Sequence, residues 1–527
     1  MKKQDEKVVR LAKPVRKGLL RLIFSRFLII FLLLLLQVGI GVVVYQWLNV
    51  VIPYFASFQM VLTAVIIIYL FNSRMDPSSK LTWMWIIAIS PIFGGAFLLF
   101  ARANLGFRNL IRQVREQLQE TKGILPQDPK ILEKLETEST GVAELNHYLN
   151  RSGCFPIYSD TSVTYFPSGE AKFEALLEEL QKAEKFIFLE YFIIEEGYMW
   201  GRVLKILLEK VKAGVEVRVL YDGMCEMFQL RPGYFKLLEK EGIQAKTFLP
   251  IKPLLSSHYN YRDHRKILVI DGKVAFTGGV NLADEYINRV QRFGHWKDTA
   301  IMLKGPAVRS FTLMFLQMWN LNVNEALYIP YLHENRENSD DSSKQEGYVM
   351  PYGDSPLDEE KVGESVYIDM LYRANDYVHI MTPYLILDGE MEAALLYAAE
   401  RGIDVKLILP GIPDKKIAYA LAKSHYRRLV EAGVEIYEYT PGFVHAKTMV
   451  SDHQKAIVGT INLDYRSLYH HFECAAYLYQ VPCIAEIDRD FEETLGKCRR
   501  VTEETIRHEK LFYRVMGQIM KFVAPLF

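Results

Sequence analysis

The chain has 527 residues, with 63 Lys plus Arg against 63 Asp plus Glu, and half of its residues are hydrophobic. This length allows two or three domains with full cores, and the even charge balance gives no indication of nucleic-acid binding. The five cysteines are odd in number and lack Cys-x-x-Cys spacing, so neither a disulfide framework nor a zinc site is predicted.

Three apolar runs near the amino terminus predict a membrane module. A basic tail, residues 1–26, carries nine Lys or Arg against two acidic residues, and the runs Phe27–Leu48, Pro53–Phe71 and Leu81–Ala101 follow. The first run is long enough to cross a hydrocarbon core of about 30 Å as a helix. A cleaved signal peptide is disfavoured because further apolar runs follow. We therefore expect a cytoplasmic tail and, over 27–101, a multi-pass transmembrane module of two to three helices.

The sequence does not decide on which side of the membrane the remaining chain lies. Basic loops stay inside, so three full spans place everything after Ala101 outside, which is the side slightly favoured. However, Pro91 and Gly94-Gly95 can break the third run into a re-entrant or interfacial segment. Residues 102–150 are charged and polar, and we expect a solvated linker there.

From residue 151 onward, alternating strand and helix patterns predict an α/β fold. The pattern occurs twice, since Ala213–Val219 matches Arg401–Leu407 at an offset of 188 residues. The repeat predicts two halves, 151–332 and 363–527, joined by a linker at 333–362. His333–Glu346 contains no apolar side chain in fourteen residues, which is typical of a flexible surface linker.

Each half contains the same chemically informative motif, and the two copies are 181 residues apart. The motif is His-x-Lys-x4-Asp, followed by Gly-Gly-x-Asn or Gly-Thr-x-Asn. Residues two apart on a strand share a face, so each copy places an imidazole beside an ammonium. Glycine and asparagine suit close approach to a phosphate. The candidate catalytic residues are His264, Lys266, Asp271, His445, Lys447 and Asp452, and the candidate phosphate-binding residues are Gly279, Asn281, Thr460 and Asn462. The two aspartates follow strand turns, so we expect them to hold the motif rather than touch substrate.

A catalytic imidazole needs an acceptor on its other nitrogen. Aligning the segments after the two motifs matches Asp298 with Glu473. We expect Asp298 to orient His264 and Glu473 to orient His445; exposed carboxylates at strand starts are the alternative. At the carboxyl end, residues 507–527 predict an amphipathic helix, either on a bilayer surface or packed on the domain.

The doubled motif resembles the phospholipase D superfamily, and within it the bacterial cardiolipin synthases. The resemblance covers roughly Pro53 to the carboxyl terminus, and the run Phe27–Leu48 is extra to the common two-span pattern. The segments that carry it are Asn260–Lys266, Phe276–Asn281, Met381–Tyr384 and Asn462–Ser467.

The resemblance implies two α/β/α sandwich halves sharing one active site in a bacterial cell membrane protein. It implies a reversible transfer in which one phosphatidylglycerol gives its phosphatidyl group to the enzyme and a second accepts it, producing cardiolipin and glycerol. By analogy, His264 is the nucleophile that forms a phosphohistidine and His445 the acid and base, although the duplicated sequence itself does not break this symmetry. The lysines supply positive charge, so no metal and no cofactor are expected.

Other functions stay open at this stage. A phospholipase D, or a phosphatidylserine synthase-type transferase, would use another acceptor with the same site. A membrane-anchored nuclease is disfavoured because no dense basic stripe is present. A non-catalytic membrane scaffold is disfavoured because both histidines and both lysines are intact. Oligomeric state and acyl-chain preference cannot be read from the chain.

Overall fold

A computed structural model describes residues 9–12, 39, 42–47, 54–102, 108–153, 155–250, 261–321, 323, 326–332, 346–358 and 360–526. In these residues the chain forms two compact units. The larger contains residues 9–12, 110–250 and 261–520; the smaller contains 54–102 and 521–526. Most of the predicted basic tail and of Phe27–Leu48, and the linker His333–Glu346 except for Glu346, lie outside the described residues.

The first half of the larger unit is a seven-stranded mixed sheet with the order β1-β9-β7-β6-β2-β3-β4. Strands β2, β3 and β4, at one side of the sheet, are parallel to one another, and the other neighbouring strands pair antiparallel. The strands are β1 (Ser162–Phe166), β2 (Phe186–Tyr191), β3 (Glu216–Asp222), β4 (Gln244–Phe248), β6 (Lys266–Ile270), β7 (Val274–Gly278) and β9 (Ala300–Lys304). The helices are α9 (Gly169–Gln181), α10 (Tyr198–Lys212), α11 (Met224–Phe228), α12 (Tyr234–Lys240), α13 (Val308–Trp319) and α14 (Ile329–Leu332), with a 3-10 turn η1 (Asp284–Ile287).

The second half repeats this order, as the internal duplication predicted. Its sheet runs β10-β17-β16-β15-β11-β12-β13, and β18 adds an antiparallel edge. The strands are β10 (Tyr348–Asp354), β11 (Tyr377–Met381), β12 (Asp404–Pro410), β13 (Glu435–Tyr439), β15 (Thr448–Ser451), β16 (Lys455–Gly459), β17 (His471–Tyr479) and β18 (Cys498–Arg500). The helices are α15 (Val362–Tyr372), α16 (Gly389–Glu400), α17 (Lys416–Glu431), α18 (Tyr465–Tyr469), α19 (Ile484–Leu495) and α20 (Glu503–Arg507).

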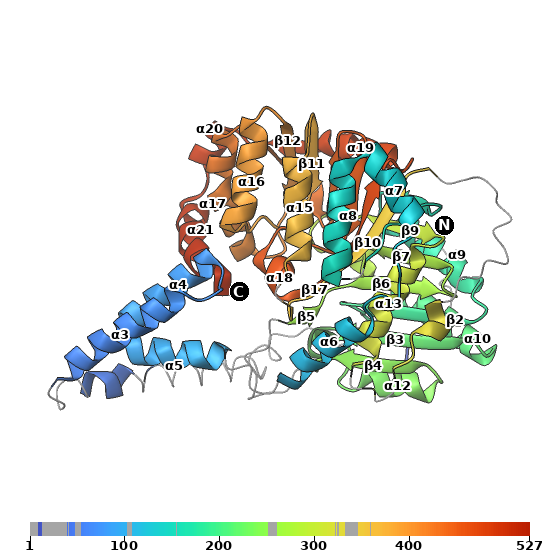
Figure 1. Cartoon of the computed structure of the whole chain (residues 1–527), viewed down its shortest axis with the longest axis horizontal. Coiled ribbons are helices and arrows are strands. Elements are labelled where there is room, and N and C mark those ends of the chain that lie inside the picture. Colours follow the sequence, from blue (N-terminus) through green and yellow to red (C-terminus); the bar gives the residue numbers. More distant parts are fainter. Residues whose placement is uncertain are drawn as a thin grey trace. The chain divides into compact units, whose positions relative to one another are not determined.

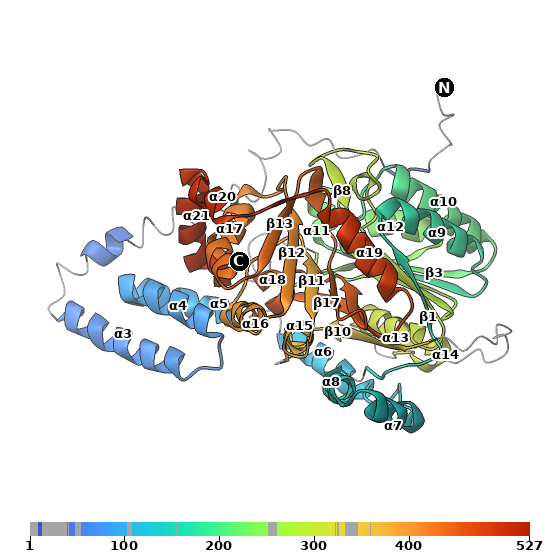
Figure 2. The ribbon, with the colours of Figure 1, turned by 90° about the horizontal axis from the view of Figure 1, so that it is seen from above.

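Helices cover both faces of each sheet (Figures 1 and 2). In the second half, α15 and α16 lie on one side and α19 on the other. This double cover explains why central strands such as β2 and β6 are buried along their whole length and read as continuous apolar runs rather than as alternating patterns. The α/β prediction for both halves is confirmed.

Two short parallel pairings connect the halves directly. The segment before the first motif, β5 (Arg262–Asp263), pairs with the start of β17 in the second half. The segment before the second motif, β14 (Gly442–Val444), pairs with β8 (His295–Lys297) of the first half. The next backbone amides continue both pairings, because His264 N donates to Phe472 O (2.9 Å) and His445 N donates to Lys297 O (2.7 Å). Each histidine is therefore fixed against the opposite half.

Residues 108–153 form three helices, α6 (Arg108–Glu120), α7 (Pro129–Glu138) and α8 (Thr140–Gly153). Helix α8 packs against β10 and α15, and its Val142, Leu145 and Leu149 are buried. This corrects the expectation of a solvated linker over this part of the chain. The three apolar residues recur at helical spacing, which produces a buried stripe despite the polar composition.

The smaller unit contains α3 (Phe55–Phe71), α4 (Pro77–Ile89) and α5 (Pro91–Arg102) around Leu70, Trp83, Ile87 and Leu98. The third apolar run is interrupted between Ile89 and Pro91, where the sequence placed a possible break. Across the described part of the chain, none of the helices combines the length and the apolar character needed to span a membrane.

The predicted carboxyl-terminal helix is observed as α21 (Leu511–Val523), followed by a 3-10 turn, η3 (Ala524–Leu526). Its Tyr513 ring contacts Tyr419 of α17, with centroids 5.5 Å apart. Gly517 faces α17 so closely that a Cβ there would lie 2.4 Å from Ala420 O. One side therefore packs on the domain, while Leu511 and Phe512 are exposed on another.

Candidate active site

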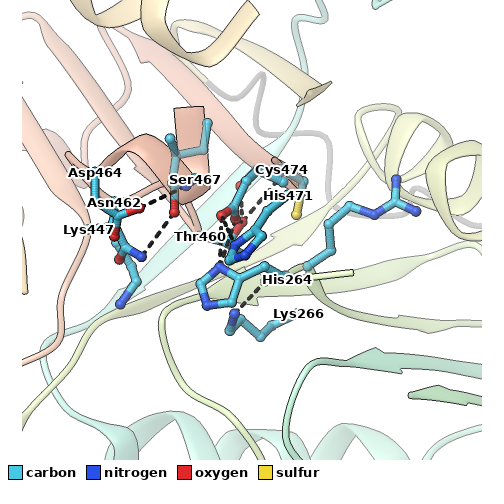
Figure 3. A network of polar contacts seen from close by, with 12 residues as sticks. His264, Lys266, Lys447, Thr460, Asn462, Asp464, Ser467, His471 and Cys474 are labelled. Carbon is cyan, nitrogen blue, oxygen red and sulfur yellow. Dashed lines mark hydrogen bonds and ion pairs between the residues drawn. The ribbon is translucent and has the colours of Figure 1, made fainter. Parts of the chain in front are cut away.

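The two His-x-Lys motifs meet at one buried site. His264 and Lys266 lie where β5 leads into β6, and His445 and Lys447 lie between β14 and β15. All four residues are at most 7% exposed. Lys447 and His445 both act on the pKa of His264, although they belong to the other half, and Figure 3 shows Lys447 and His264 within one polar network. The predicted shared site is thus assembled from both halves.

Each histidine is held by a carboxylate from the opposite half. His264 Nδ1 lies 2.8 and 3.0 Å from the two Glu473 oxygens, and His445 Nδ1 lies 2.7 Å from Asp298 Oδ2. The residues were predicted correctly but their pairing was wrong, because Asp298 was assigned to His264 and Glu473 to His445. The β5–β17 and β8–β14 pairings explain the exchange, since they place each motif beside the carboxylate-bearing strand of the other half.

The electrostatic surroundings of the two histidines differ. Burial, Lys266 and His471 hold the pKa of His264 well below its usual value, which keeps the ring neutral. When Nδ1–H donates to Glu473, the Nε2 lone pair of His264 is available for attack. Burial and Lys447 lower the pKa of His445 to about 4, while Asp298 opposes them.

The two supporting carboxyl groups also differ. Burial raises the pKa of Glu473 well above its usual range. Burial would do the same for Asp298, but His445 and Lys447 keep its pKa below the usual value, so Asp298 is ionised. An ionised partner stabilises an imidazolium, which makes His445 the better proton carrier of the two.

The lysines are almost completely buried beside the histidines. Lys266 and Lys447 each donate to the carbonyl of their own motif histidine, and Lys447 Nζ also lies 2.9 Å from His445 Nδ1. Burial lowers the pKa of Lys266 to about 8 and that of Lys447 to about 7. An incoming phosphate would compensate these desolvated cations, which is the property required of groups that stabilise a phosphoryl transition state.

The motif aspartates lie at the far ends of the motif strands. Asp271 accepts from the backbone amides of Glu184, Lys185 and Phe186 at 2.7–2.8 Å. Asp452 accepts from those of Asn375, Asp376 and Tyr377 at 3.0–3.2 Å. Both close the turn that leads into β2 or β11, so they hold the motif, as expected from their position, and do not reach the histidines.

Gly279 and Thr460 occupy equivalent positions behind the supporting carboxylates. A Cβ on Gly279 would lie 2.0 Å from Asp298 Oδ1, so only glycine leaves room for this carboxylate. Thr460 instead donates its hydroxyl to Glu473 Oε2. Both residues thus contact the carboxylates that support the histidines, and their predicted role in binding phosphate stays a prediction.

The two asparagines also bond within the chain. Asn281 is fully buried, donates to Tyr286 Oη (2.8 Å) and accepts from Ile193 N (3.0 Å). Asn462 donates to Ser467 Oγ at 3.0 Å. Their amide groups therefore fix the loops after β7 and β16, and the predicted role as phosphate donors stays a prediction.

Three polar residues near the site were not predicted. Arg265, the middle residue of the first motif, donates to Glu190 at 2.6 Å beneath the site. His471 and Trp296 flank His264 and His445, with ring centroids 5.2 Å apart in both pairs. Contacts between the halves reveal His471 and Trp296, because a strand-start histidine or tryptophan carries no distinctive sequence signal, whereas Arg265 pairs within its own half.

Two clusters in the described residues place three potential metal ligands close together. One is His264, His471 and Glu473, and the other is Glu364, Asp388 and Glu390. Lys361 neutralises the second cluster, with Nζ 3.3 Å from oxygens of both glutamates. Lys266 lies beside the first, so its charge favours an anion over a cation.

Comparison with known proteins agrees with this architecture. The family model described as "Cardiolipin synthase, PLD-like domain" matches residues 176–319 and 367–495. A cardiolipin synthase of Halalkalibacterium halodurans is 31% identical over 95% of this chain and 99% of its own length. An uncharacterized protein of Streptococcus mutans is 57% identical over 87% of this chain and 99% of its own length. The crystal structure of phosphatidylserine synthase from Haemophilus influenzae covers 74% of this chain and 100% of its own length, with TM-score 0.55 and 14% identity, so it shares the fold.

Proposed function

Since the chain belongs to the family of cardiolipin synthases with phospholipase D-like domains, a group of phosphatidyltransferases, we propose that it makes cardiolipin and glycerol from two molecules of phosphatidylglycerol. The observation that carries this proposal is the buried pair of His-Lys sets, each histidine backed by a carboxylate from the other half. Such a site exchanges one phosphodiester for another through a covalent intermediate and conserves the bond energy.

In the first step, His264 Nε2 attacks phosphorus and forms a P–N bond while the P–O bond to glycerol breaks. His445, protonated to the imidazolium beside ionised Asp298 when the anionic phosphodiester binds, gives its Nε2 proton to the departing glycerol oxygen and returns to the neutral ring. Lys266 and Lys447 balance the charge on the phosphoryl oxygens. The assignment of His264 as nucleophile rests on family analogy, and its low pKa and neutral ring support it.

In the second step, a terminal hydroxyl of another phosphatidylglycerol occupies the position vacated by glycerol. His445 removes its proton, the hydroxyl oxygen attacks phosphorus, and the P–N bond breaks. Asp298 stabilises the imidazolium that forms on His445, because its carboxylate is ionised. The two steps are chemically alike, so the reaction is reversible.

We also propose that the chain works at the bacterial cell membrane. Its substrates are bilayer lipids, and α3, α4 and α5 expose large apolar side chains such as Phe58, Ile68, Trp85 and Leu99. Leu511, Val515 and Ile519 on α21 expose more apolar surface. A multi-pass anchor near the amino terminus stays part of this proposal. We keep the domain bounds predicted from the sequence as part of this proposal; they are 1–26, 27–101, 102–150, 151–332, 333–362 and 363–527.

The amino-terminal segment supports an arrangement with the active site in the cytoplasm. Val9, Leu11 and Ala12 pack against the core of the first half, and the Leu11 and Ala12 amides lower the pKa of Glu196 against the effect of burial. The basic tail and the catalytic halves then share one side of the membrane, which requires an even number of crossings between them. Labelling of a single cysteine in the tail and another in α9, in intact cells and inverted vesicles, checks this: equal accessibility supports it and opposite accessibility contradicts it.

Supplying the purified protein with phosphatidylglycerol alone in detergent tests the proposed reaction. We expect cardiolipin from the wild-type protein, and none from folded His264→Ala or His445→Ala variants. Phosphatidic acid as the sole product would favour a phospholipase D instead. Transfer that occurs only when serine and a nucleotide-activated lipid are supplied would favour the phosphatidylserine synthase-type alternative. No turnover of any phospholipid would favour a scaffold.

A further inference from the structure

His471 is a buried histidine whose ring nitrogens have no hydrogen-bond partner among the described residues. It begins β17, and its ring lies against that of His264 with centroids 5.2 Å apart (Figure 3). The residue is 7% exposed, and neither ring nitrogen is hydrogen-bonded in the described parts of the chain. Its Nδ1 is 3.6 Å from Glu473 Oε1, which is too long for a hydrogen bond. Because burying an unpaired polar group is costly, these nitrogens are suited to a partner beyond the described residues.

The opposite half provides an internal comparison. Trp296 occupies the place that corresponds to His471, and its ring lies 5.2 Å from that of His445. The only polar atom of this indole, Nε1, donates to Asp298 Oδ2 at 3.3 Å. The ring beside His445 is thus an indole whose polar atom already has a partner. The ring beside His264 is an imidazole whose nitrogens have no partner among the described residues. The two sides of the pseudo-symmetric site are chemically unequal.

The charges around His471 indicate which ligand fits. Burial and the nearby cations Arg466, Lys266 and Arg262 all lower its pKa, so the ring is neutral and stands in a positive field, to which His470 adds no charge because burial lowers its own pKa to about 4. A neutral imidazole has one N–H to donate. Glu473 is the nearby acid, and burial raises its pKa, so it offsets little of this positive field. Such a field attracts a negatively charged oxygen and repels a metal cation.

We propose that His471 is a substrate-binding residue that donates a hydrogen bond from its ring N–H to a phosphoryl oxygen of the lipid head group held against His264. The proposal deepens the proposed function and rests on it for the identity of the lipid. It adds a neutral donor to the two lysines and makes the His264 side the more strongly phosphate-binding flank.

Three substitutions isolate this donor. His471→Phe keeps a planar ring and removes the N–H, while His471→Gln restores an N–H donor. His470→Phe is the matched control, because the neighbouring ring lies near Tyr261, with centroids 6.4 Å apart, and not against His264. Thermal unfolding of each full-length variant in detergent verifies that it is folded.

The first readout is calorimetric titration with inorganic phosphate, and the second is kcat and KM with phosphatidylglycerol. We expect His471→Phe to weaken phosphate binding and to lower kcat/KM by about 10- to 100-fold, the effect of one hydrogen bond to a charged group. His471→Gln should recover most of both losses, and His470→Phe should match the wild type.

Unchanged phosphate affinity in a folded His471→Phe variant would overturn the proposal, including the case in which turnover alone falls, because His471 would then only position His264. Equal losses in His470→Phe would also overturn it. The phosphate titration does not depend on the product formed. If the wild-type protein released phosphatidic acid and His471→Phe still weakened phosphate binding, the proposed cardiolipin reaction would be wrong. The role of His471 in binding phosphate would stand.

Discussion

Replacing Asp298 with Asn should separate the two chemical steps. Asp298 Oδ2 is 2.7 Å from His445 Nδ1, both groups are buried, and Thr299 N donates to the other oxygen at 2.9 Å. That backbone amide keeps the Asn carbonyl on its side and turns the NH2 group toward His445. The NH2 group then donates to Nδ1, which leaves the His445 proton on Nε2 and removes the lone pair needed by a general base.

The expected loss in steady-state turnover is about 10³- to 10⁴-fold, as when a serine protease triad loses its carboxylate and the histidine tautomer is reversed; this corresponds to about 4–5.5 kcal/mol of barrier. Both steps should lose with phosphatidylglycerol, because the Nε2–H tautomer cannot accept a proton and could donate its own only by becoming an imidazolate. With phosphatidyl-p-nitrophenol, whose leaving group needs no proton, the first step should survive and the second should fail, so a phosphatidyl group should accumulate on His264. Intact-protein mass spectrometry after mixing with this substrate, followed by peptide mapping, measures this species.

Glu473→Leu is the matched comparison, since it removes the acceptor from His264 and should prevent the covalent species from forming. If Glu473→Leu accumulated the adduct and Asp298→Asn did not, the crossed pairing of carboxylates and histidines would be refuted. An adduct located on His445 would refute the assignment of roles.

Further predictions concern the lysines and the supporting turns. Lys447 and Lys266 must be protonated to hold phosphate, and burial lowers their pKa values to about 7 and 8, so kcat/KM should fall as pH rises through this range. Lys447→Arg, which stays charged, should move the alkaline limb toward that of Lys266; an unmoved limb in the pH profile would contradict this. Gly279→Ala places a Cβ 2.0 Å from Asp298 Oδ1 and should lower kcat by about 100-fold through displacement of His445, whereas Gly389→Ala, with open space around it, should have no effect. Asp271→Ala removes three hydrogen bonds from backbone amides and should cost about 3 kcal/mol in urea unfolding, with little change in kcat of the folded protein; a kinetic loss without a stability loss would contradict its structural role.

Much of the fold could be predicted from the sequence because the same pattern of strands and helices occurs twice. Segments such as Ala213–Val219 and Arg401–Leu407 fix equivalent strands, and the observed sheets share one strand order. The helix α8 was missed because its few apolar residues form only a narrow stripe within a polar segment. Composition gives only the average polarity of the segment, whereas helix packing depends on the spacing of Val142, Leu145 and Leu149.

The residues of the site were predictable, but their connections were not. Local sequence order suggests that Asp298 serves His264, since both lie in one half. The parallel pairing of β5 with β17 brings Glu473 to His264 instead, and a single sequence carries no signal for pairings between halves. The contacts of Asn281 with Tyr286 and Ile193 lie within its own half but were also not predicted, and its phosphate-binding role stays a prediction.

Transfer between two phosphatidylglycerol molecules can be followed with a doubly labelled substrate. Phosphatidylglycerol labelled in the head-group glycerol and in the acyl chains is supplied as the sole lipid. We expect one free glycerol for each cardiolipin formed, with half of the head-group label retained in cardiolipin. Release of all the head-group label, with every labelled acyl chain in phosphatidic acid, would show that water is the acceptor and would contradict this expectation.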